Sequence, residues 1–130
     1  MKPQEAYLKC IRENRIIKEL EDLIATDPYY SCEYAREIIK GPWKLGEESI
    51  SNDTEYSYCY ACDIINGRFE LGEKSISVDP YYSYHYAHDV IRGPFEKCHP
   101  IIFNSEYKDD YISFLKSIDY DISKISEWLI

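Results

Sequence analysis

The sequence lacks the features that would mark an enzyme or a membrane protein. Its 5 glycines form no phosphate-binding loop or nucleophile elbow, and its 3 histidines form no zinc-hydrolase helix motif. No apolar run approaches the length of a membrane span, and the first residues show no charged-then-apolar leader. We therefore expect a non-catalytic protein that resides in the cytoplasm.

Basic residues are also scarce relative to acidic ones. Fifteen Lys and Arg oppose 24 Asp and Glu, which gives a formal net charge of −9. Such a chain repels a phosphate backbone, so direct nucleic-acid binding is disfavoured. The 5 cysteines are an odd number without a secretory signal, which favours free thiols in a reducing compartment.

Tyrosine is in excess, with 14 copies, and most of them belong to an internal repeat. Segments that begin at Asp27, Asp53 and Asp79 match one another at an offset of 26 residues, without insertion. Each segment carries tyrosines, an alanine, two β-branched residues, a glycine and an aromatic residue at the same spacing. A single repeat domain, 1–130, is thus predicted, with degenerate first and last units. The five units are 1–26, 27–52, 53–78, 79–104 and 105–130.

Each unit has the pattern of two short helices. The aspartates that open units two and four are suitable N-caps, and the prolines after them fit the first helical position. Apolar residues then recur at helical spacing, and we expect Gly41, Gly67 and Gly93 to end the first helix in a left-handed conformation. An aromatic turn leads to a second helix near residues 44–51, and residues 98–100 (Cys-His-Pro) are expected to break its counterpart in unit four. The sequence predicts an all-α fold, an α-solenoid of about five two-helix repeats.

The repeat resembles a known kind of sequence. Residues 53–73 contain the pattern Tyr-x-Tyr-x-Tyr-Ala-x-Asp-Ile-Ile-x-Gly-x-Phe-x-x-Gly-Glu. This pattern is similar to the short tandem α-helical repeats of uncharacterised bacterial and bacteriophage proteins, and the resemblance covers units two to four. It implies an α-solenoid and a phage or mobile-element origin, and it implies no reaction. Those repeats often carry proline after the turn aromatic, where this chain has Lys44, Glu70 and Glu96.

The helical spacing divides the tyrosines into two groups. Tyr34, Tyr60 and Tyr86 fall in the inward stripe, so we expect them to pack between units with their hydroxyls at the edge. Four others are expected to be partly exposed, where rigid aromatic rings favour protein recognition, namely Tyr29, Tyr58, Tyr81 and Tyr84. The sequence thus predicts both an aromatic core and an aromatic surface.

Outward positions of the first helices differ between units, and packing does not dictate them. They form a candidate protein-binding surface that consists of Tyr29, Glu33, Arg36, Glu37, Asp63, Tyr81, Asp89 and Arg92. Acidic residues recur at Glu37, Asp63 and Asp89, and again at Glu47 and Glu73. A ladder of this kind leaves open an alternative, an acidic nucleic-acid mimic that occupies a basic cleft.

Metal-binding residue types occupy two pairs of these positions. Cys59 and Cys62 in unit three correspond to His85 and His88 in unit four, and together they supply the donor types of a Cys2His2 zinc site. The pairs converge if they flank the groove between helices, and they stay apart if they point straight outward. His85, His88 and Asp89 also offer the donor set of a two-histidine, one-carboxylate iron site. A zinc-stabilised structural repeat protein is therefore a second alternative.

The favoured hypothesis is a non-catalytic protein-binding module. Solenoids present an extended surface that is tuned by exposed residues, and this chain varies at those residues. With the phage-like resemblance, the specific expectation is a small inhibitor of a host or defence-system protein that has no contact with a membrane.

Overall fold

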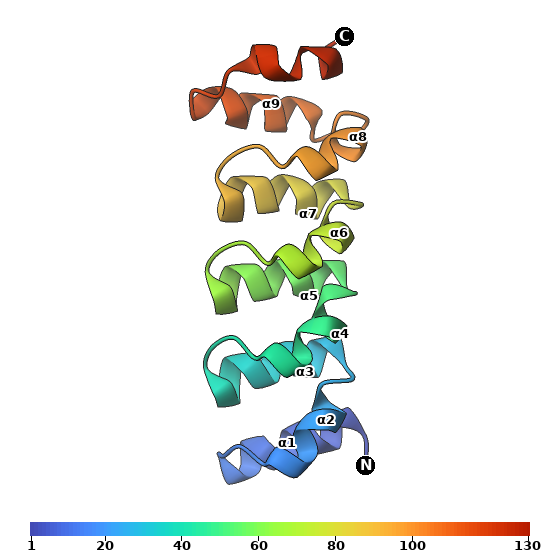
Figure 1. Cartoon of the computed structure of the whole chain (residues 1–130), viewed down its shortest axis with the longest axis vertical. Coiled ribbons are helices and arrows are strands. Elements are labelled where there is room, and N and C mark those ends of the chain that lie inside the picture. The colour runs from blue at the N-terminus through green and yellow to red at the C-terminus, as the bar shows by residue number, and fades with distance from the viewer.

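The computed structural model describes all residues, 1–130, and every regular element in it is helical. Helix pairs stack into an elongated column, with the N-terminus at one end and the C-terminus at the other (Figure 1). The predicted all-α solenoid is therefore confirmed. No helix combines the length and the hydropathy needed to cross a lipid bilayer.

The first helices of the units lie side by side along the column and make up the first-helix layer. In the three internal units the α-helix continues into a π-helical segment, a rare element that the sequence did not predict. The layer consists of α1 (Pro3–Glu13), α3 (Pro28–Tyr34) with Ala35–Ile39, α5 (Thr54–Cys59) with Tyr60–Ile65, α7 (Pro80–His85) with Tyr86–Ile91, and α9 (Lys108–Ser117). The widened turn brings two consecutive apolar residues, such as Ile64 and Ile65, against the core.

The shorter second helices form the second-helix layer. It consists of α2 (Lys18–Ile24), the 3-10 turn Lys44–Gly46 with α4 (Glu47–Ser51), Glu70–Gly72 with α6 (Glu73–Ile76), Glu96–Cys98 with α8 (His99–Ile102), and the 3-10 helix Ile122–Trp128. The second helix predicted near residues 44–51 is thus confirmed. The predicted break in unit four is wrong, because Pro100 lies in the first turn of α8, where its missing N–H is not needed.

An aspartate caps the first helix of each internal unit. The carboxylates of Asp27, Asp53 and Asp79 each accept a hydrogen bond of 2.9 Å from the backbone N–H three residues further on. Asp27 and Asp79 are followed by a proline in the first turn, as predicted. These caps fix the residue at which each first helix starts.

The left-handed residue at the end of each first helix precedes the predicted glycine. No glycine has a positive φ, and the left-handed conformation instead belongs to Lys40 (φ 61°), Asn66 (φ 59°) and Arg92 (φ 58°). The π-helical turn places the reversal one residue earlier, and the N–H of Gly67 still reaches the carbonyl of Ala61 at 3.2 Å. The glycine prediction is therefore wrong for all three units.

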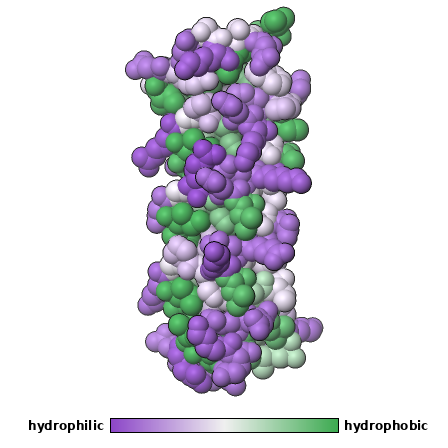
Figure 2. All heavy atoms as spheres, viewed as in Figure 1, coloured by the Kyte–Doolittle hydropathy of each residue, from purple (hydrophilic) through white to green (hydrophobic).

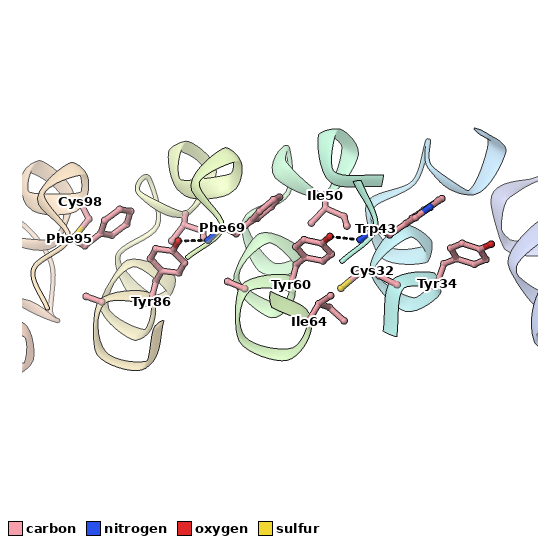
Figure 3. Packing of buried hydrophobic residues seen from close by; sticks show 14 of the residues in the cluster. Cys32, Tyr34, Trp43, Ile50, Tyr60, Ile64, Phe69, Tyr86, Phe95 and Cys98 are labelled. Carbon is pink, nitrogen blue, oxygen red and sulfur yellow. Dashed lines mark hydrogen bonds between the residues drawn. The ribbon is translucent and has the colours of Figure 1, made fainter. Parts of the chain in front are cut away.

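Buried tyrosines tie adjacent units together. The Tyr86 hydroxyl donates to Glu73 Oε2 (2.7 Å) and accepts from the backbone N–H of Phe69 (2.9 Å). Tyr60 makes the same pair of bonds one unit earlier, with Glu47 and with the backbone N–H of Trp43. The dashed line between Tyr60 and Trp43 in Figure 3 marks the second of these. Each hydroxyl thus joins the first helix of one unit to the aromatic turn and the second helix of the unit before it.

The expectation that these hydroxyls lie at the edge is wrong. Tyr34, Tyr60 and Tyr86 are fully buried. Glu21 and Glu73, which bind Tyr34 and Tyr86, are buried as well, and Glu47, which binds Tyr60, is half-buried. The Glu73 side chain is 0% exposed and also binds Arg68 (2.8 Å) and Lys97 (3.1 Å). Burial raises the pKa of Glu73, but the hydrogen bonds from these cations and from Tyr86 outweigh it and hold that pKa at about 2.

Candidate binding face

Partly exposed tyrosines run along the first-helix layer, and we call this surface the tyrosine face. Tyr29 packs edge-on against Tyr30 (4.8 Å between ring centroids) and contacts Tyr56 of the next unit (5.5 Å). Tyr81 repeats the arrangement with its neighbour in sequence (4.9 Å) and with Tyr107 of the next unit (6.0 Å). The tyrosine face comprises Tyr7, Tyr29, Tyr30, Tyr56, Tyr58, Tyr81, Tyr82, Tyr84 and Tyr107.

The outermost rings of this face are held rigidly. Tyr29 and Tyr81 are 42% and 46% exposed, yet each stands in the first turn of a helix directly after a proline. The cap aspartate fixes that turn, and the ring of the next tyrosine supports the exposed ring from one side. Little side-chain entropy remains to be lost when a partner covers them.

Arg36 connects unit two with unit three across the same layer. Its guanidinium pairs with Glu33 of its own helix and with Asp63 of the next unit, the latter at 2.9 Å. Glu33 and Arg36 are half-buried by this arrangement, whereas Glu37 and Asp63 are exposed. Three of the predicted binding residues therefore also hold neighbouring units in register.

Asp89 is the centre of a second network between units three and four. Its carboxylate accepts a hydrogen bond from the Tyr58 hydroxyl (2.8 Å) and lies 2.8 Å from His88 Nδ1 and 3.8 Å from His85 Nδ1. Burial raises the pKa of Asp89, but the hydrogen bonds from His88 and Tyr58 outweigh burial and lower it. Arg92, the remaining predicted binding residue, is exposed at the end of the same helix.

Equivalent grooves lie between the first helices near their C-terminal ends. The groove between units three and four has a volume of about 490 Å³, and its counterpart between units two and three has about 240 Å³. The larger groove has Cys62 where the smaller one has Arg36. Replacing a long side chain by a short one at one repeated position thus changes the shape of the surface without changing the backbone.

The residues predicted as zinc ligands (Cys59, Cys62, His85 and His88) do not converge. No group of three or more His, Cys, Asp or Glu side chains in the chain is arranged to hold a metal ion, and this includes the two histidines with Asp89. Cys62 lines the groove between units three and four, whereas His88 contacts Phe114 of unit five (4.8 Å). The physical reason is the repeat itself, because residues at equivalent positions point in parallel directions one unit apart.

Burial makes the cysteines weak nucleophiles. It raises the pKa of the Cys32 thiol to about 11 and that of Cys98 to about 12. The thiols of Cys59 and Cys62 also have raised pKa values, again mainly through burial. Because the thiolate is the reactive form, little of any of them is available near neutral pH.

Sequence reasoning missed part of the tyrosine face at its two ends. Tyr107 stands 26 residues after Tyr81 and takes the equivalent place, although unit five otherwise diverges. Tyr7 occupies in unit one the place that Glu33 has in unit two, and its ring contacts Tyr30 (5.5 Å). The repeat offset was the signal that could have found both residues.

On the side of the column shown in Figure 2, hydrophobic side chains form separate patches with hydrophilic ones between them. No continuous apolar band is visible there. Comparison with protein-family models, with curated proteins and with solved structures gives no match for this chain. The resemblance of the repeats to those of phage and bacterial proteins therefore stays a prediction, and function has to be argued from the geometry.

Proposed function

We propose that this chain is a non-catalytic protein-binding module whose tyrosine face contacts the partner. The observation that carries the proposal is the row of mutually packed and partly exposed tyrosine rings along one layer of the column. Tyrosine is enriched at the centres of protein interfaces because it buries a large area at a low entropic cost. A solenoid built from short units supports such a row over its whole length.

The reactive groups of the chain favour binding over catalysis. The cysteine thiols have raised pKa values, and the buried glutamates hold neighbouring units together. The exposed histidines and Asp89 form a surface network rather than lining an enclosed pocket. These side chains are therefore engaged in packing and in the stability of the column.

The resemblance to phage repeats gives the proposal a finer form, a small cytoplasmic inhibitor that occupies a host or defence-system protein. The alternative of a nucleic-acid mimic is less favoured by the geometry. Such a mimic needs free carboxylates at a regular spacing, whereas Glu73 is fully buried and Asp63 and Asp89 already have partners in the chain.

The test is affinity capture with a matched pair of variants. The immobilised full chain is exposed to a bacterial lysate, and bound proteins are identified by mass spectrometry. We expect one stoichiometric protein on the native chain, and its loss from the Tyr29→Ser, Tyr81→Ser double variant. The control is the Leu45→Ser, Leu71→Ser double variant, which removes equally exposed side chains from the second-helix layer and should retain the partner. Equal retention by all three proteins, or no stoichiometric protein at all, would overturn the proposal.

A further inference from the structure

The tyrosine face contains one carboxylate at a place that tyrosine occupies in other units. Tyr29, Glu55, Tyr81 and Tyr107 stand at equivalent positions, so Glu55 interrupts the outer row. The Glu55 side chain is exposed, and the ion pairs of the chain involve other carboxylates. It is thus a free negative charge in a row of aromatic rings.

Tyr56 and Tyr82 take the places around Glu55 that Tyr30 and Tyr56 take around Tyr29, whose ring contacts both of them (4.8 and 5.5 Å between centroids). Tyr56 and Tyr82 both have raised pKa values, chiefly through burial and next through the charge of Glu55. Tyr56 belongs to the same unit as Glu55, and Tyr82 belongs to the next. A cation placed at Glu55 would therefore lie between the two rings.

The rest of the tyrosine face has the same electrostatic character. Glu33 and Glu37 raise the pKa of Tyr7 after the effect of burial, and Asp110 and Asp89 do the same for Tyr84. Other carboxylates face Tyr107, namely Glu106, Asp79 and Asp110. Arg36 is a cation that acts on Tyr7, and both of its partners are already in place, while Lys108 stands at the repeat position of Tyr82. The face therefore combines aromatic π-surfaces with uncompensated negative charge.

We propose that the tyrosine face binds an extended, arginine-rich segment of the partner protein, with one guanidinium at Glu55 between Tyr56 and Tyr82. This inference rests on the proposed function and adds the chemistry of the partner. Arginine fits better than lysine, because its planar guanidinium stacks on tyrosine rings while it pairs with a carboxylate. A purely apolar segment would bury the carboxylates without a partner, and a nucleic acid would meet like charge.

The dimensions of the repeat suggest how the arginines are spaced. Neighbouring helix axes lie about 8–10 Å apart, and a chain in the polyproline II conformation advances about 3.1 Å per residue with about three residues per turn. One unit therefore spans about one such turn, and every third side chain points to the same side. A segment with an arginine at about every third position would place a guanidinium on each successive unit.

The test uses synthetic peptides and the full-length chain. A fluorescently labelled peptide of about 12 residues, with arginine at about every third position and serine and glycine elsewhere, is titrated by fluorescence anisotropy. We expect saturable binding, and at least about tenfold weaker binding by the Glu55→Lys variant. The control is Glu70→Lys, which changes the net charge equally but lies in the second-helix layer, and its affinity should match that of the native chain. The lysine version of the peptide should also bind more weakly.

Several results would overturn the inference. The first is that the Glu55→Lys and native chains bind the arginine peptide with equal affinity. The second is that Glu70→Lys weakens this binding as much as Glu55→Lys does. The third is that an apolar peptide or a single-stranded oligonucleotide binds as tightly as the arginine peptide. No peptide binding, together with a captured protein that the Tyr29→Ser, Tyr81→Ser variant loses, would reject the partner chemistry and leave the proposed function standing. Clear peptide binding without any captured protein would reject the proposed function and leave the preference of the face for arginine standing. Circular dichroism of each variant verifies that it is folded.

Discussion

At the scale of single residues, the hydroxyl of Tyr86 couples two units through one atom. It donates to the buried carboxylate of Glu73 and accepts from the N–H of Phe69. Because both partners are buried, neither can replace this hydrogen bond by one to water. A hydrogen bond to a charged group contributes about 1.5–3 kcal/mol, and an unsatisfied buried group adds a cost of similar size. The second and third unit boundaries thus depend on a few polar atoms as well as on apolar packing.

The first prediction concerns that hydroxyl. Tyr86→Phe keeps the ring but leaves Glu73 with one donor fewer, and we expect the free energy of unfolding to fall by about 2 kcal/mol. Urea denaturation followed by circular dichroism measures the change. The matched control is Tyr58→Phe, whose hydroxyl binds Asp89 at the exposed surface and whose loss should cost less than about 0.5 kcal/mol. An equal decrease in the free energy of unfolding of both variants would show that the buried hydroxyl of Tyr86 contributes no more to stability than the exposed hydroxyl of Tyr58.

Between units four and five, a histidine replaces the glutamate that binds the buried tyrosine hydroxyl. His99 replaces the glutamate, and its Nε2 lies 2.8 Å from the Tyr111 hydroxyl, which also accepts from the N–H of Phe95 (3.0 Å). A neutral imidazole whose Nε2 carries no proton accepts the Tyr111 hydroxyl proton, whereas a charged imidazolium can only donate. Burial lowers the pKa of His99, while the charges of Glu96 and Glu127 oppose this effect.

The second prediction follows from that lowered pKa. The folded state takes up a proton on His99 less readily than the unfolded state does, so its contribution to stability is present above about pH 6.5 and is lost as the pH falls below that value. We expect the thermal midpoint to decrease between pH 7.5 and pH 5, and the decrease to be smaller in His99→Gln, whose amide oxygen accepts the same proton. Glu73 does not interfere, because its contribution is lost only below about pH 4.5.

An exposed histidine provides the control for this measurement. His88→Gln removes an imidazole from the surface network and should keep the decrease toward pH 5. An unchanged pH profile in His99→Gln would assign the acid sensitivity to another group.

At the scale of elements, close contact explains the second glycine of units two and three. A Cβ on Gly72 would lie 2.5 Å from Ser57 Oγ and 2.7 Å from the Phe69 ring, where the second helix meets the first. The backbone does not demand glycine there, since Cys98 has φ −92° and ψ −4°, close to the −91° and −5° of Gly72. Packing around Gly72 is therefore the constraint in unit three, whereas in unit four the same place accommodates the buried Cys98 side chain.

The third prediction separates the two kinds of glycine. Gly72→Ala should lower the free energy of unfolding by about 1–3 kcal/mol, because the added methyl overpacks the contact between the helices. Gly67→Ala should change it by less than about 0.5 kcal/mol, since the nearest atom to its Cβ would be 3.9 Å away and its φ is not positive. Chemical denaturation of the two variants in parallel decides the matter, and a reversed order would contradict the packing argument.

The elements could be predicted from the sequence to the extent that their causes are local. Caps, helix spacing and the repeat offset are visible as residue types, so the helix pairs and the exposure of Tyr29 and Tyr81 followed from them. The π-helical turns, which shift the left-handed residue to Asn66, have no local signature. That the four residues of the metal hypothesis do not cluster has a related reason, because the directions of Cys62 and His88 depend on how successive units are stacked.

At the scale of the whole molecule, the column depends on contacts between neighbouring units. Each buried tyrosine hydroxyl and the Arg36–Asp63 pair joins one unit only to the next one. The last unit keeps this scheme with a shifted register, since Tyr111 takes the place of Tyr86 after 25 residues instead of 26. Stability should therefore be close to a sum of unit terms and boundary terms.

The fourth prediction tests that sum by adding a unit. A second copy of residues 53–78 inserted after residue 78 supplies its own cap, its own tyrosine and its own carboxylate for the ties on both sides. We expect the helical circular-dichroism signal and the denaturant m-value both to rise by about one fifth, in proportion to the added chain, with a higher free energy of unfolding. A flexible Gly/Ser insert of the same length at the same place should raise neither quantity. An inserted repeat that behaves like this linker would show that the units do not stack as interchangeable neighbours, and the idea of a continuous tyrosine face would lose its structural basis.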